Sequence, residues 1–86
     1  MSQLILYYQP ECHLCDEAES LMHSLGLGES YHKVDIETDL KLLQRYEIYV
    51  PVLQRKDNQQ ELFWPFGQVE IEAFLTPPAD FKQPAS

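Results

Sequence analysis

Two cysteines, Cys12 and Cys15, stand between an apolar run and a helical pattern, and this arrangement constrains the fold more than any other feature. The run Leu4–Tyr8 precedes them, and an amphipathic stripe with a 3.6-residue period begins at Leu14. Residues three apart on the first turn of a helix lie on one side, so the two thiols come close enough for a disulfide. The unpaired amides and the dipole at that end of a helix also favour a thiolate. The motif therefore predicts a redox-active dithiol.

The C-x-x-C spacing is shared with haem attachment sites, zinc sites and inert cysteine pairs. Haem attachment needs a histidine directly after the second cysteine, whereas Asp16 stands there. A structural zinc site needs four ligands, and the chain offers only His13, His23 and His32 beside the two thiols, with no second C-x-x-C. We therefore expect no bound metal, while a zinc site and an inert pair stay open as alternatives.

Length and charge limit the partners of this chain. Its 86 residues can bury a single core. Six basic residues stand against fourteen acidic ones, and the formal charge of −8 repels nucleic acid and anionic membrane surfaces. The sequence shows neither a signal-peptide pattern nor an apolar run of transmembrane length. We expect a cytoplasmic domain without nucleic-acid or membrane partners, in which a cysteine pair is more often catalytic or metal-binding than a structural crosslink.

Hydrophobic periodicity and turn residues predict an α/β domain over residues 1–76 and a loose tail over residues 77–86. The predicted strands cover residues 3–8, 31–37, 52–55 and 61–64. The predicted helices cover residues 13–26, the segment from Thr38 to before Pro51, and the segment from Gly67 to Pro77. The first strand is apolar on both faces, as a central strand is, and the second alternates as an edge strand does. Strand, helix and strand in this order form a right-handed parallel crossover.

The second predicted helix is amphipathic. Its inner face is expected to carry Leu40, Leu43 and Tyr46, with Lys41 and Arg45 in solvent. Most aromatic side chains of the sequence fall on positions that a small core needs, so we expect them to be buried.

The order of these elements and motifs resembles the glutaredoxins, above all the short glutaredoxin-like proteins of the thioredoxin-like superfamily. Three motifs carry the resemblance: the C-x-x-C at residues 12–15, Tyr49–Pro51 in place of Thr-Val-Pro, and Gly67 as the second glycine of Gly-Gly. The resemblance implies a three-layer α/β/α fold around a four-stranded mixed sheet with strand order 2-1-3-4. It also implies that the peptide bond before Pro51 is cis and that this proline lies opposite the dithiol.

The resemblance further implies a thiol–disulfide oxidoreductase. Cys12, nearer the helix start and solvent, is expected to attack a disulfide, and Cys15 to resolve the mixed disulfide. Val50 is expected to offer its N–H and C=O groups to an extended substrate beside Pro51. The predicted substrate surface is completed by Tyr49, Phe66 and Gly67. A non-catalytic binding module of the same fold and a metal or cluster carrier are the alternatives.

Charged neighbours are expected to modulate the dithiol. A protonated His13 favours the thiolate of Cys12, whereas Glu11 opposes it. Because these two effects oppose each other, the helix terminus sets the direction of the shift, and we expect a depressed pKa for the Cys12 thiol. Members of the family that bind glutathione carry a basic residue where Gln9 stands, and Glu70 is at best a substitute for their acidic residue. These departures argue against glutathione as a co-substrate, and no other cofactor is predicted. The expected partners are a protein or small-molecule disulfide as substrate and a thiol as reductant. The protein itself is expected to be a monomer.

Overall fold

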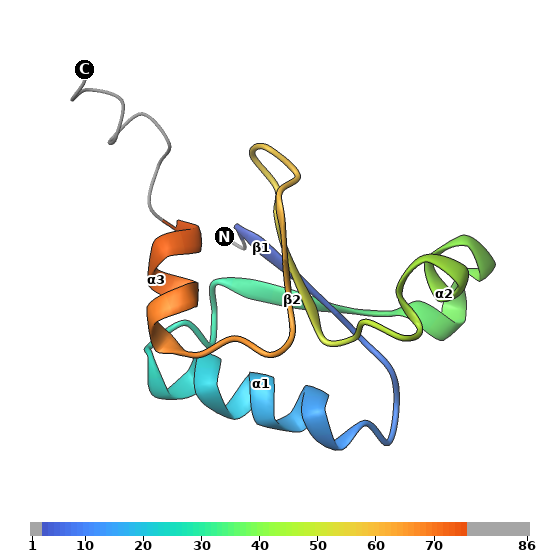
Figure 1. Cartoon of the computed structure of the whole chain (residues 1–86), viewed down its shortest axis with the longest axis horizontal. Coiled ribbons are helices and arrows are strands. Elements are labelled where there is room, and N and C mark those ends of the chain that lie inside the picture. Colours follow the sequence, from blue (N-terminus) through green and yellow to red (C-terminus); the bar gives the residue numbers. More distant parts are fainter. Residues whose placement is uncertain (1–2, 76–86) are drawn as a thin grey trace.

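A four-stranded sheet forms the middle layer of the domain, with helices on both of its faces (Figure 1). The computed structural model describes residues 3–75, and the predicted tail over 77–86 lies outside them. The strands are β1 (Leu4–Tyr8), β2 (Tyr31–Asp35), β3 (Val52–Arg55) and β4 (Glu61–Phe63). The helices are α1 (His13–Ser24), the 3₁₀-helix η1 (Ile36–Thr38), α2 (Leu40–Tyr46) and α3 (Gln68–Leu75). No helix in this described part is long and apolar enough to cross a membrane.

The strand order is β2-β1-β3-β4, which confirms the predicted mixed sheet. β1 is central, parallel to β2 and antiparallel to β3, while β4 pairs antiparallel with β3 as the predicted hairpin. Alternation along β1 sends Leu4 and Leu6 to one face and Tyr7 to the other. This two-sided burial explains why the first strand is apolar throughout.

Each face of the sheet has its own core. On one face, Ala18 and Met22 of α1 and Ile71 of α3 pack on Leu4 and other strand residues, and all four of these side chains are at most 1 % exposed. Figure 1 shows α1 and α3 next to each other, and α2 on the far side of the strands from them. The second core joins α2 and η1 to the opposite face. Burial of these side chains is the main driving force for the fold.

Several predicted element boundaries were wrong, for local reasons. β2 ends at Asp35 rather than at residue 37, because the Asp35 carboxylate accepts the Glu37 N–H at 2.8 Å and starts η1. The first helix ends at Ser24 rather than at residue 26, and Gly26 follows in the left-handed region at φ 77°. β4 ends at Phe63, before a cis Trp64–Pro65 bond that the sequence did not predict.

The inner face of α2 was predicted incorrectly at one position. Asp39 caps the helix by accepting the Lys41 N–H at 2.8 Å, which leaves Leu40 in the first turn, 67 % exposed. Leu43 and the buried Tyr46 belong to the inner face as predicted, and Leu42 packs against the second core in place of Leu40.

Tyrosines carry much of the second core. The rings of Tyr7 and Tyr46 stack at 4.5 Å between centroids, and Tyr7 donates its hydroxyl to Gln54 Oε1 at 2.8 Å. The Tyr46 hydroxyl donates to the Glu61 carboxylate, which Arg45 also approaches at 3.5 Å. Burial and this hydrogen bond raise the pKa of Tyr46 to about 12. The polar ends of these rings are therefore satisfied inside the core.

Tyr31 has a similar environment on the other face. Its ring packs in the first core, and its hydroxyl donates to Glu19 Oε1 at 3.0 Å. Lys33 Nζ lies 3.0 Å from the other oxygen of Glu19. Burial and the hydrogen bond to Glu19 raise the pKa of Tyr31 to about 12.

We predict that two phenols ionise late and that stability falls with them. The folded state holds the protons of Tyr31 and Tyr46 more tightly than the unfolded chain, in which phenols titrate near pH ~10. The resulting stabilisation is complete below about pH 10 and is lost as the pH rises from about 10 to 12, on the order of 2 kcal/mol for each phenol. Ultraviolet titration of tyrosinate, and urea unfolding across this range, measure both effects.

The matched variants are Tyr46→Phe and Tyr31→Phe, each of which should remove one late-titrating phenol and flatten the loss of stability. Urea-unfolded protein is the reference for ordinary phenols. Ionisation of all five tyrosines of the chain together, near pH ~10, would contradict the prediction.

Candidate functional site

Cys12 and Cys15 form a disulfide at the start of α1. Their Cα atoms are 5.2 Å apart, within the range that a disulfide requires. Cys12 is the N-cap residue, with extended backbone at φ −105° and ψ 109°, and its Sγ accepts the Cys15 N–H at 3.1 Å. The predicted placement of the motif at a helix start is thereby confirmed.

The two sulfur-bearing residues differ in exposure. Cys15 is 2 % exposed and belongs to the buried face of α1, whereas Cys12 is partly exposed. The difference follows from the helix, because Cys15 lies one turn into it, on the side that packs against the sheet. Of the two residues, Cys12 is therefore the more accessible to a molecule in solvent.

The residues around Cys12 are acidic and open to solvent. Glu11 is exposed and has a left-handed backbone, φ 60°, in the turn that carries the chain from β1 into α1. His13 lies 3.0 Å from Glu17, one turn along α1, and its side chain is 85 % exposed. When His13 carries a positive charge, the Glu17 carboxylate pairs with it and weakens its effect on the Cys12 sulfur.

The register of the sheet brings the Val-Pro segment to the same end of the domain. Tyr7 pairs with Val52 in antiparallel fashion, so the chain leaves β1 towards Cys12 at the edge where it enters β3 from Pro51. Pro51 is fully buried, and its peptide bond with Val50 is cis, which confirms what the resemblance implied.

The expected role of Val50 needs a correction. Its N–H donates to the carbonyl oxygen of Tyr46 at 3.0 Å, and the Tyr49 N–H donates to the same oxygen at 2.8 Å. These bonds close the last turn of α2, whose terminal carbonyls otherwise lack partners. Only the carbonyl oxygen of Val50 is left for an extended substrate, not both backbone groups.

The other predicted substrate residues lie in different environments. Tyr49 is 47 % exposed and stacks on Phe63. Phe66 is 5 % exposed, packs in the first core and meets Trp64 edge-on at 5.0 Å between ring centroids, so little of its surface can meet a substrate. Gly67 donates its N–H to Glu70 Oε1 at 2.8 Å, so that carboxylate caps the start of α3.

Phe63 is one of the aromatic side chains that were expected to be buried, but it is a surface residue beside the Val-Pro segment. It pairs with Val52, the residue after Pro51, and is 44 % exposed. The signal was present, because a hairpin that starts directly after Pro51 must place the end of its second strand next to that proline.

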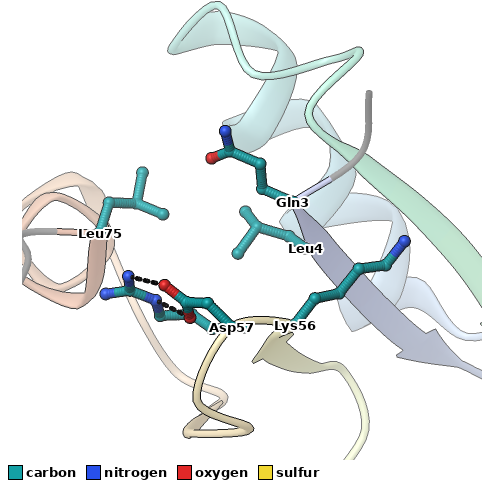
Figure 2. Close-up of a pocket in the computed structure, with 6 residues that line it drawn as sticks. Gln3, Leu4, Lys56, Asp57 and Leu75 are labelled. Atoms are coloured by element: carbon teal, nitrogen blue, oxygen red, sulfur yellow. Dashed lines mark hydrogen bonds and ion pairs between the residues drawn. The ribbon is translucent and has the colours of Figure 1, made fainter.

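A cavity of about 460 Å³ lies at the other end of the sheet (Figure 2). Its lining includes Leu4, at the start of β1, and Leu75, at the end of α3. Arg55 donates to both carboxylate oxygens of Asp57, at 3.0 and 2.6 Å, and lowers the pKa of that carboxyl. It also donates to the Phe74 carbonyl oxygen at 2.9 Å, which caps α3. Neither Cys12 nor Cys15 lines this cavity.

Among residues 3–75, no three histidine, cysteine, aspartate or glutamate side chains come together in a way that could hold a metal ion. The described residues bring a disulfide with one partly exposed cysteine to the same end of the sheet as a cis proline and two exposed aromatic side chains.

Comparison with known proteins relates this arrangement to a family. The model of the family described as "Glutaredoxin-like domain (DUF836)" matches residues 3–76. No curated protein matches the sequence significantly. The crystal structure of protein XcR50 from X. campestris is 36 % identical, with a TM-score of 0.77 over 86 % of this chain and 99 % of that one.

Two solution structures are also similar. That of XcR50 is 35 % identical, with a TM-score of 0.75 over 90 % of this chain and 97 % of that one. Protein Ne2328 from Nitrosomonas europaea is 26 % identical, with a TM-score of 0.73 over 86 % of this chain and 91 % of that one. Because the family model spans all of the described residues and the relatives share the fold along their lengths, this chain belongs to the glutaredoxin-like (DUF836) family.

Proposed function

We propose that this protein is a thiol–disulfide oxidoreductase that exchanges electrons through Cys12 and Cys15. The observation that carries the proposal is the asymmetry of the pair: one sulfur-bearing residue is partly exposed at the N-cap of α1, and its disulfide partner is 2 % exposed. An inert structural crosslink needs no such asymmetry, whereas stepwise exchange requires one accessible sulfur and one that waits behind it.

The reaction runs in two balanced steps. The Cys12 thiolate of the reduced protein attacks a substrate disulfide, forms a mixed disulfide and releases one substrate thiolate, which takes up a proton. Cys15, deprotonated, then attacks the Cys12 sulfur and releases the second substrate thiol. The protein is oxidised to the disulfide, the substrate gains two electrons and two protons, and a thiol reductant reverses the change in the protein.

Local structure supports the first step. In the oxidised protein the Cys15 N–H already points to the Cys12 sulfur at 3.1 Å. The same amide, with the other unpaired amides at the start of α1, stabilises negative charge on that sulfur once the disulfide is reduced. The Val50 carbonyl oxygen, at the same end of the sheet, accepts an N–H from the substrate backbone and aligns the disulfide.

We predict opposite behaviour for the two cysteine variants. Cys12→Ser should lower disulfide exchange to the uncatalysed background, because no accessible thiolate is left. Cys15→Ser should still attack but should accumulate the mixed disulfide, because nothing resolves it. Mass spectrometry of both variants after incubation with a disulfide substrate measures the trapped adduct.

Val69→Ala, at a 74 % exposed position of α3, is a control for handling and folding and should react as the wild type does. Equal trapping by the two cysteine variants would contradict the assigned polarity. A wild-type dithiol that binds partner proteins but never closes under mild oxidant would favour the binding-module alternative.

Glutathione is a poor co-substrate in this proposal. Gln9 and Glu11 precede Cys12 and offer no cation to the glutathione carboxylates, and the Glu70 carboxylate already accepts the Gly67 N–H. With a formal charge of −8, the field of the whole protein also repels this anionic tripeptide.

We predict that Gln9→Lys combined with Glu11→Gln raises activity in a glutathione-coupled assay by about two- to fivefold, as expected for exposed charge contacts. Glutamine is chosen at position 11 because a β-branched residue would be strained at φ 60°. The gain should shrink as salt is raised through about 0.15 M, where the Debye length is about 8 Å.

The control is Gln60→Lys with Glu29→Gln, which makes the same change in net charge at two exposed positions near the other end of the sheet. An equal gain in this control would assign the effect to net charge alone. Efficient turnover of the wild type with glutathione, unaffected by either pair of substitutions, would sink the prediction.

A further inference from the structure

Two large aromatic side chains are stacked in solvent at the end of the sheet where the chain leaves β1 for Cys12. The rings of Tyr49 and Phe63 lie 5.3 Å apart between centroids at an interplanar angle of 20°, and the residues are 47 % and 44 % exposed. Tyr7, Tyr31 and Tyr46, in contrast, are at most 9 % exposed. We call the exposed pair Tyr49–Phe63 the aromatic shelf. Aromatic residues that could be buried but remain at the surface are enriched in binding surfaces.

The sheet register brings the shelf to the end of the sheet at which the chain leaves β1 for Cys12. Phe63 pairs with Val52, and Trp64 donates its N–H to the Pro51 carbonyl oxygen at 3.2 Å, so the end of β4 lies against the Val-Pro segment. Because Tyr7 also pairs with Val52, the chain passes from β1 to Cys12 at this same edge. A polypeptide that is bound at Cys12 and extends along this end of the sheet can therefore reach the shelf.

The backbone keeps the shelf in place before any partner arrives. The Tyr49 N–H donates to the Tyr46 carbonyl oxygen at 2.8 Å, at the end of α2. Phe63 is a strand residue whose neighbours in the hairpin are paired with β3. A preorganised apolar surface loses little entropy when a ligand packs on it, which favours binding.

The exposed charged side chains on α1, on α2 and just before Cys12 are mostly carboxylates, which favours a partner with positive charge. Glu11, Asp16 and Glu17 are all exposed, and the one nearby imidazole, His13, is paired with Glu17. On α2, Arg45 lies 3.5 Å from Glu61 and over the Tyr46 ring, while Lys41 is exposed. Glu47 adds another exposed carboxylate two residues before Tyr49. Exposed carboxylates near Cys12 and just before Tyr49, together with an exposed apolar pair at the same end of the sheet, are complementary to a basic segment that carries an apolar side chain.

We propose that the substrate is a polypeptide disulfide whose reacting cysteine has an aromatic or large aliphatic side chain close by, with lysine or arginine beside it. The apolar side chain packs on the aromatic shelf, and the basic groups face the carboxylates next to Cys12. This inference rests on the proposed thiol–disulfide exchange and names its substrate class.

The test uses four short blocked peptides, each with one cysteine and each oxidised to its symmetric disulfide dimer. They combine phenylalanine or serine at one position with lysine or glutamate at another. Reduced protein converts each dimer into two peptide thiols while Cys12 and Cys15 close to the disulfide, and chromatography measures the rate. Each rate constant is divided by that of the same dimer with dithiothreitol, which corrects for the reactivity of the peptide sulfur itself.

Phenylalanine should raise the corrected rate about three- to tenfold over serine, the size of one aromatic contact. Lysine should exceed glutamate at low salt, and this ratio should fall as ionic strength rises. Phe63→Thr and, separately, Tyr49→Ser should bring the phenylalanine-to-serine ratio towards one, whereas Val69→Thr, exposed on α3, should keep the wild-type ratio.

The outcomes separate this inference from the function on which it rests. If the wild type reacts with none of the peptides and also fails with bis(2-hydroxyethyl) disulfide, the proposed exchange itself is wrong. If it reduces that small neutral disulfide but shows ratios of one among the four peptides, the exchange stands and the substrate class is overturned. The wild-type comparison needs no variant, so a variant that fails to fold cannot obscure the result.

Discussion

The antiparallel pairing of β1 with β3 is the constraint on which the rest of the structure depends. The register that sets Tyr7 opposite Val52 brings the start of α1 and the Val-Pro segment to the same end of the strands. Pairing with both β2 and β3 makes β1 a central strand. A shift by one residue would turn every side chain of β1 to the opposite face and exchange the contents of the two cores. The site beside Cys12 is thus a consequence of the same pairing that builds the core.

Each of the two cores holds a different helix against the sheet: the first core holds α1, and the second holds α2. α1 is held by apolar side chains, with Ala18 and Met22 fully buried, so the disulfide at its start sits on a rigid element. α2 is short and is held through the stacked rings of Tyr7 and Tyr46 and the carboxylate of Glu61. Because α2 ends in the bonds that fix Tyr49 and Val50, this tyrosine core also positions the segment that precedes Pro51.

Features that depend on residues close together in the sequence were predicted well, and features that depend on other contacts were predicted less well. The placement of Cys12 at a helix start and the central position of the first strand follow from patterns along the chain, and both were predicted. The ends of elements were less predictable, because side chains such as Asp35 compete for backbone groups and stop a strand early. Leu40 fits a helical stripe but lies in the first turn of a short helix, where the stripe does not reach the sheet.

The sequence by itself determined the period of each element, the dithiol at a helix N-terminus and the acidic charge, because all three depend on neighbours along the chain. Tertiary structure alone decided that Tyr49 meets Phe63 in solvent, that Phe66 is buried, and that the Val50 N–H is already bonded. These outcomes depend on which segments the sheet register and the end of α2 bring together in space. Pairing at long range and competition for backbone hydrogen bonds are settled only when the whole domain packs.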